Sequence, residues 1–202
     1  MALAMARLLL SLAGPGGVWG ISAWRRFAAT PLARQLDQAE AEFLKALAID
    51  RNAQPALIGL AAVYEQRGEP ERALELLRGL VHSDAVYAAG RMTKMAELYV
   101  RLGRQADGIA YFESLQGQGA HWEEGRNTAL GVVYAAAGRS QDAERALKRA
   151  LAVDPSCVPA MQELFPLYDS QGRAAELEPL LRRGLQKEPR SGMFNNWLAL
   201  VL

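Results

Sequence analysis

Tyrosine and glycine recur in this chain at a nearly constant step, and no other feature constrains the fold as strongly. Four tyrosines are spaced 35, 35 and 34 residues apart, and a glycine lies four residues after each of them. The eight residues are Tyr64, Tyr99, Tyr134, Tyr168, Gly68, Gly103, Gly138 and Gly172. Self-similarity at this period indicates a helical repeat array, in which each repeat packs on its neighbours. Such arrays bind other molecules, so the period predicts a binding protein and not an enzyme.

The tyrosines divide most of the chain into four segments of one design. We expect these repeats at residues 54–87, 89–122, 124–157 and 158–191. Each repeat starts with a helix that carries a bulky apolar residue, a small residue and then the tyrosine, as in Leu130, Gly131 and Tyr134. A second helix follows the glycine. Its apolar residues are three and four positions apart, which places them on one helical face.

Each residue type in the repeat has a packing role. The small residue lets the paired helix approach closely, and the tyrosine fills the space that this leaves. The glycine closes a short connection where a side chain would be strained in the left-handed region. Pro155 and Pro189 end their second helices, since proline cannot continue a helix. We therefore expect the tyrosines to be packing elements, not platforms for nucleic-acid bases.

The pattern resembles the tetratricopeptide repeat family over residues 35–202. The resemblance is close in the repeat at 124–157, which matches the family's signature positions. The matching residues are Leu130, Gly131, Tyr134, Gly138, Ala143, Ala150 and Pro155. The resemblance implies an all-α fold, a right-handed superhelical solenoid of antiparallel helix pairs. It implies about four full repeats, with half-repeats at 35–53 and 192–202.

The repeat at 158–191 departs from this design at three positions. Pro166 lies inside its first helix, where proline removes a backbone hydrogen bond at a cost of about 3 kcal/mol. Phe165 replaces the small residue, so the helix pair should close less tightly, and Pro179 falls early in the second helix. We expect a locally altered path of the array at this repeat.

The first 34 residues have a different character. No acidic residue precedes Asp37, and residues 8–24 are uncharged between Arg7 and Arg25. This stretch is at the short limit for a membrane span, and glycine and proline at positions 14–17 break its helical pattern. Three interpretations of residues 1–34 remain open: a cap on the array, a membrane anchor or secretory signal, and an organelle transit peptide.

The composition argues against several kinds of chemistry. The net charge of +1 provides no global attraction for nucleic acid. Cys157 is the single cysteine, so no disulfide can form within the chain. The two histidines, His82 and His121, lie in different repeats and lack the spacing of a metal site. We expect no catalytic residues, no metal and no cofactor.

The family resemblance also implies where a partner binds. In this family the first helices line an inner, concave surface that holds partner peptides. The corresponding residues are Ile58, Ala62, Glu65, Lys94, Glu97, Arg101, Thr128, Val132, Ala135, Gln162 and Asp169. Some family members grip a peptide carboxylate with lysine and asparagine at these helices, but only Lys94 remains of that set here. The floor of small residues suits an extended segment or a helix.

These observations predict a non-catalytic scaffold or adaptor that holds a protein or peptide, with a membrane tether through residues 8–24 left open. The alternative is the repeat portion of a larger enzyme, such as a glycosyl- or sulfotransferase or a membrane transferase, with its catalytic domain elsewhere. The apolar helix expected at 192–202 fits either interpretation, since it either packs back onto the array or continues into a longer protein. Binding of nucleic acid is not expected. The partner and compartment are unspecified, although a bacterial cytoplasmic or envelope-associated setting is favoured over a mitochondrial one.

Overall fold

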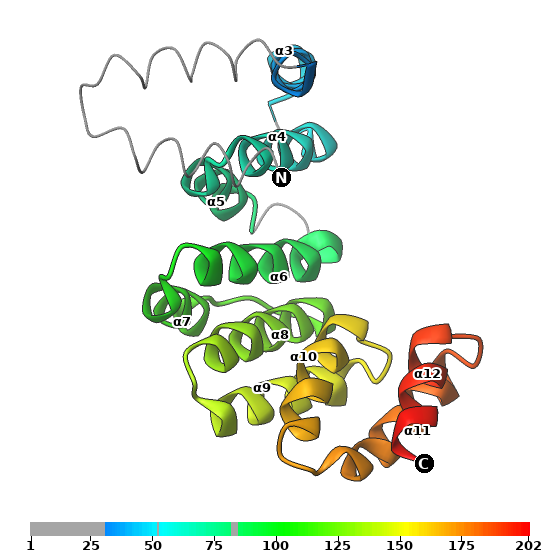
Figure 1. Ribbon diagram of the computed structural model, residues 1–202. Coiled ribbons are helices and arrows are strands. Elements are labelled where there is room, and N and C mark those ends of the chain that lie inside the picture. Colours follow the sequence, from blue (N-terminus) through cyan, green and yellow to red (C-terminus); the bar gives the residue numbers. More distant parts are fainter. Residues whose placement is uncertain (1–30, 52, 82–84) are drawn as a thin grey trace. The chain divides into compact units, whose positions relative to one another are not determined.

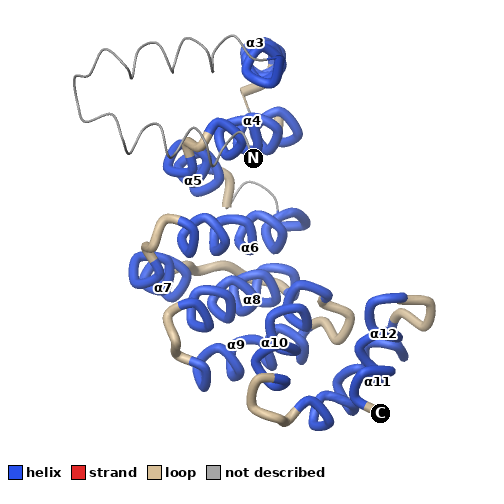
Figure 2. The backbone as a smooth tube through the Cα atoms, in the orientation of Figure 1, coloured by secondary structure: helices blue, strands red, loops and turns tan. Residues whose placement is uncertain are grey.

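The computed structural model describes residues 31–51, 53–81 and 85–202, and these residues are helical apart from short connections (Figure 1, Figure 2). This described part contains no β-strand, which confirms the predicted all-α class. The helices are α3 (Pro31–Ile49), α4 (Gln54–Arg67), α5 (Pro70–Gly79), α6 (Ala85–Arg101), α7 (Gln105–Ser114), α8 (Ala120–Ala136), α9 (Ser140–Val153), α10 (Val158–Asp169), the 3₁₀ helix η1 (Ala174–Leu177), α11 (Glu178–Lys187) and α12 (Gly192–Val201).

The chain divides into two compact units, of which the first is Met1–Leu77. In this unit α3 packs against α4. The ring of Phe43 fills the space beside Gly59, where an added Cβ would lie only 2.2 Å from Phe43 Cζ. Arg67, the last residue of α4, also pairs with Glu40 of α3 at 2.5 Å. A close apolar contact and an ion pair therefore join these two helices.

The second unit, Arg78–Leu202, stacks helix pairs in the order that the sequence predicts. The first helices are α6, α8 and α10, and the second helices are α7, α9 and the combination of η1 with α11 (Figure 1). Helix α8 contacts α6, α7, α9 and α10, while α12 contacts α11. The chain is therefore a helical repeat array, as expected.

The turn inside each repeat has the predicted left-handed glycine. The φ angles are 80°, 69°, 74° and 67° at Gly68, Gly103, Gly138 and Gly172. In each turn the amide after the glycine donates to the carbonyl of the repeat tyrosine, as Arg139 N does to Tyr134 O at 2.9 Å. This bond satisfies a carbonyl that the helix end leaves free. All four repeat tyrosines are buried, which confirms their packing role.

The small residue of the repeat allows the close helix contact that the sequence predicts. An added Cβ at Gly131 of α8 would lie 2.3 Å from Leu147 Cδ2 of α9. Leu147 is fully buried, together with Ala143 and Ala150 of the same helix. Helices α8 and α9 thus pack through one apolar face, with glycine at their closest approach.

The last repeat is irregular, but mainly in its second helix. Helix α10 continues through Pro166 as one element, Val158–Asp169. The second helix is split into η1 and α11, and Pro179 lies in the first turn of α11, where a backbone N–H would have no partner within the helix. The ring of Phe165 stacks on Trp197 of α12, with centroids 6.3 Å apart. The bulky residue is therefore accommodated by contact with α12.

The first and last described helices of the array are α3 and α12. Helix α3 begins at Pro31, so helical structure starts before the expected boundary between residues 34 and 35. Helix α12 packs on α11 through Phe194, whose ring fills the space beside Gly184. Within the described ranges no helix has the length and hydropathy needed to cross a bilayer. The three interpretations of the N-terminal segment concern residues that are almost all outside this description.

Candidate partner-binding face

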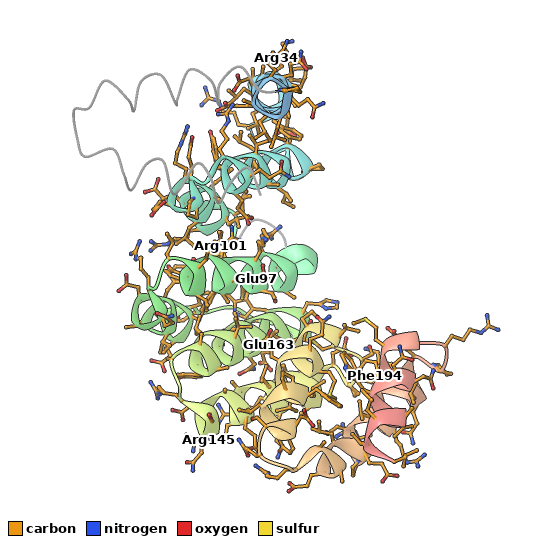
Figure 3. The ribbon with its side chains drawn as sticks, in the orientation of Figure 1. Arg34, Glu97, Arg101, Arg145, Glu163 and Phe194 are labelled. Atoms are coloured by element: carbon orange, nitrogen blue, oxygen red, sulfur yellow. The ribbon has the colours of Figure 1, made fainter. Side chains whose placement is uncertain are left out.

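The first helices of the second unit lie next to one another and carry eight of the predicted partner-binding residues. Helix α8 lies in contact with both α6 and α10. The eight residues are Lys94, Glu97 and Arg101 on α6, Thr128, Val132 and Ala135 on α8, and Gln162 and Asp169 on α10. Figure 3 labels Glu97 and Arg101 on α6 and Glu163 on α10. We call this set without the buried Thr128, and with Glu163 added, the first-helix face.

Most of these residues are accessible, as a binding surface requires. Arg101, Gln162 and Asp169 are exposed. Lys94 Nζ lies 3.1 Å from Glu97 Oε2, and the two side chains remain 42% and 49% exposed. An ion pair this open contributes little to stability, so a partner can approach both charges at little cost.

Two predicted partner-binding residues on α8 are less exposed than a binding surface requires. Thr128 is 1% exposed and Val132 is 9% exposed. The Thr128 hydroxyl lies 3.6 Å from the thiol of Cys157, inside the repeat. Thr128 therefore stabilises the packing of α8 and does not offer its side chain to a partner. Val132 forms part of the floor between the flanking helices.

Helix α8 is buried here because small residues bring it close to α6. An added Cβ at Gly125 would lie 2.3 Å from the Cα of Ala89 on α6. Ala129, one turn later, is fully buried. The backbone approach explains why the middle helix presents little side chain, while the flanking helices carry the charged groups.

Glu163 on α10 adds a carboxyl group to this face. Its side chain is half-buried, and burial followed by the negative charge of Glu97 raises its pKa. The negative charge of Glu97 on α6 therefore acts on Glu163 of α10. The structure thus groups Lys94, Glu97 and Glu163.

Three further predicted residues, Ile58, Ala62 and Glu65, lie on α4 in the first unit. The Ile58 side chain is exposed. Ala62 is exposed as well, and Glu65 is partly exposed. In that unit, these residues are accessible on the first helix of their repeat, as predicted.

The comparisons with known proteins agree with the fold. Two family models match the chain, both described as tetratricopeptide repeat, at residues 32–94 and 128–159. The chain belongs to the tetratricopeptide repeat family. No curated protein matches it by sequence.

Solved structures of other proteins are also similar to this chain. TTC0263, described as a thermophilic TPR protein in Thermus thermophilus, aligns with a TM-score of 0.56 and 26% identity, over 84% of this chain and 92% of that one. A crystal structure of MamA aligns with a TM-score of 0.48 and 21% identity, over 79% of this chain and 92% of that one. The fold is one that typically serves as a protein–protein interaction scaffold.

The tetratricopeptide tyrosines are held by polar contacts that sequence reasoning missed. Tyr134 donates from its hydroxyl to Glu113 of the preceding repeat, and Tyr168 donates in the same way to Glu144. The Arg139 guanidinium also lies 4.6 Å from the centre of the Tyr134 ring. The glutamates precede their tyrosines by 21 and 24 residues, so no constant spacing reveals them. These contacts join successive repeats and hold the rings in place as packing elements.

Cys157 has the environment of an inert thiol. It is buried, and its Sγ donates to Glu124 Oε1 at 2.9 Å. Burial, and then the hydrogen bond to Glu124, raise its pKa to about 12. Because the thiolate is the reactive form, Cys157 is unsuited to nucleophilic chemistry near neutral pH. Across the residues that the structure covers, no group of three or more His, Cys, Asp and Glu side chains could hold a metal ion.

Proposed function

We propose that this tetratricopeptide protein is a non-catalytic scaffold that holds a segment of another protein against the first-helix face of α6, α8 and α10. The observation that supports this most directly is the arrangement of three adjacent first helices with exposed charges on the outer two. Helix α8 between them contributes the floor, which includes Val132 and the partly exposed Ala135. An extended segment or a helix can approach such a floor closely.

The charges on this face favour protein over nucleic acid as the partner. Lys94 and Arg101 are accompanied by Glu97, Glu163 and Asp169, so both signs are present. A phosphate backbone requires a stripe of one sign, whereas a peptide with mixed side chains can pair with both. The proposal does not depend on residues 8–24, and a membrane tether there is a separate question.

The direct test is affinity capture with the full chain and a matched pair of variants. Lys94→Glu combined with Arg101→Glu inverts two charges on the first-helix face. Arg145→Glu inverts a charge on α9, a second helix, where the Arg145 side chain is 69% exposed. We expect the first variant to bind its specific partner about tenfold or more weakly than the native chain does, and the control to bind it with unchanged affinity.

Both variants should keep the helical circular dichroism signal and the melting temperature of the native chain, because the substituted side chains are accessible to solvent. If the double variant retains its partners as well as the native chain does, the assignment of the binding face is wrong. If the Arg145→Glu control alone loses them, the partner binds the second helices.

A further inference from the structure

A cavity lies away from the first-helix face, at the connection between α7 and α8. Its volume is about 520 Å³. The lining residues are Leu115, Gln116, Gly117, Gln118, Trp122, Glu123 and Arg126. All of them belong to the second unit, and they come from residues 115–118 of the connection and from the first two turns of α8. We call it the linker cavity.

The apolar wall of the linker cavity is formed by Leu115 and Trp122, and Gly117 of the connection packs directly against the indole ring. Trp122 is only 5% exposed and Leu115 only 7%. An added Cβ at Gly117 would lie 2.0 Å from Cε2 of the Trp122 indole. The connection therefore passes so close to the indole that only glycine fits. This contact holds the connection and Trp122 in place relative to each other.

Arg126 supplies a cation with unused hydrogen-bonding capacity. It lies one turn after Trp122 on α8 and is partly buried. Its Nη1 donates to the Leu115 carbonyl at 3.5 Å, which is long for a hydrogen bond. Its Nε is buried and, within the described structure, has no hydrogen-bond acceptor. A guanidinium can donate five hydrogen bonds, and a buried donor without a partner costs free energy.

Among the described residues, Arg126 makes no ion pair with a carboxylate, unlike several other arginines. Seven others in the described residues pair with Asp or Glu: Arg67, Arg72, Arg104, Arg139, Arg145, Arg173 and Arg182. Glu123 lies three residues before Arg126, a spacing at which such pairs form on a helix, and yet among the described residues it is exposed and makes no ion pair with Arg126. In this part of the chain Arg126 therefore makes no ion pair, although it lines the cavity together with Glu123.

We propose that the linker cavity binds a carboxylate carried on an apolar peptide segment, with Arg126 as the anchor. A carboxylate has two acceptor oxygens in the geometry that a guanidinium fork matches. Leu115 and Trp122 provide an apolar wall for the adjoining side chain, and Gln116 and Gln118 offer amides at the rim. The volume is within the range of sites that bind small ligands.

The test uses the full chain and three short peptides. One is acetyl-Gly-Leu-Leu with a free C-terminal carboxylate, the second is its C-terminal amide, and the third is acetyl-Gly-Asp-Leu-amide, with the carboxylate on a side chain. Binding is followed by NMR through the indole N–H signal of Trp122, assigned with a Trp122→Phe variant. We expect at least one carboxylate peptide to shift this signal, and to bind about tenfold or more tightly than the amide. The two carboxylate peptides distinguish a chain terminus from an acidic side chain.

The matched variants are Arg126→Gln and Arg145→Gln. The first removes the unpaired guanidinium and should weaken carboxylate binding about tenfold or more, while the second removes a paired arginine on α9 and should change nothing. Gln118→Glu places a negative charge at an exposed rim position, so it should weaken binding without affecting folding even if Arg126→Gln proves unstable. The proposal is overturned if neither carboxylate peptide shifts the indole signal at millimolar concentration. It also fails if the amide binds equally well or if both cavity variants bind like the native chain.

Discussion

Two neighbouring repeats of the second unit pack their helices in different ways. One repeat consists of α8 and α9, and the other of α10, η1 and α11. In the first, Gly131 lets α8 touch Leu147 of α9 directly. In the second, Phe165 occupies the equivalent position and stacks on Trp197 of α12. The first repeat is thus completed by its own helix pair, and the second by the helix that follows it. A tetratricopeptide array tolerates a broken signature position when a neighbouring helix supplies the missing contact.

Removal of a buried ring from the first repeat, and of another from the α12 helix that completes the second, should have the largest effect and should separate the two modes of closure. Tyr134→Ala and Phe194→Ala should each lower the free energy of unfolding by about 3–5 kcal/mol, because each removes a buried aromatic side chain. Tyr134→Ala should increase amide hydrogen exchange in α8 and α9. Phe194→Ala should increase it in α11 and α12, and a loss under about 1 kcal/mol in denaturant titration would show that the ring concerned is not a core element.

Substitution by alanine at the equivalent position should have opposite physical consequences in the two repeats. Gly131→Ala should overpack the contact with Leu147 and cost about 1–3 kcal/mol, offset by up to about 1 kcal/mol of helix propensity. Phe165→Ala should underpack the contact with Trp197 and lose about 0.5–1.5 kcal/mol of ring pairing, in addition to the buried area of the side chain. Urea titrations measure both. A double-mutant cycle of Phe165→Ala with Trp197→Ala should show coupling, and strict additivity would contradict the proposed closure by α12.

The two contacts that join the repeat of α8 and α9 to its neighbours should respond to opposite ends of the pH scale. The ordinary pKa of Tyr134 is 10.0, and burial and the hydrogen bond to Glu113 raise it to about 12 in the folded chain. This contribution to stability is complete below about pH 10 and is lost as the pH rises toward about 12. Tyr134→Phe should remove that alkaline loss in a denaturant titration at several pH values. An unchanged alkaline slope in Tyr134→Phe would exclude the hydroxyl as its source.

The contact between α9 and the repeat of α10 contains an acid-sensitive group, Glu144. Although burial acts in the opposite direction, the hydrogen bonds from Lys148, Tyr168 and Arg173 lower the pKa of Glu144 from 4.5 to about 2. A carboxyl with a lowered pKa stabilises the fold above about pH 4.5, and this stabilisation is lost as the pH falls toward about 2. Glu144→Gln should therefore reduce the acid dependence of unfolding. If its stability falls with acid as steeply as that of the native chain, other carboxyls are responsible.

The sequence is sufficient to predict the regular parts of this molecule. The step of the tyrosines and glycines predicts the helix pairs, the left-handed turns and the burial of Tyr134, because these depend on contacts that recur in every repeat. The register of the family resemblance selects Lys94, Glu97 and Gln162 as candidate partner-binding positions, and their side chains are at least partly exposed. The tetratricopeptide resemblance supplies the choice of helices for a partner.

Other features of the fold and of the candidate site depend on how deeply a helix is buried and on the shape of a loop. The spacing of residues in the sequence does not encode either property. Thr128 has the helical position of a surface residue, but α8 lies too close to its neighbours for the side chain to emerge. The division of the last second helix into η1 and α11 follows from local backbone geometry near Pro179. The linker cavity depends on the close passage of Gly117 by Trp122, which no repeating pattern in the sequence indicates.

Photocrosslinking can show whether a partner protein contacts the first helices, on which the proposed function depends. A photoreactive amino acid is placed at Gln162 on α10 in one protein and at Arg145 on α9 in another. Both positions are exposed, so neither substitution should disturb the fold. We expect a crosslinked partner from position 162 and none from position 145. Crosslinking from position 145 alone would contradict binding by the first helices.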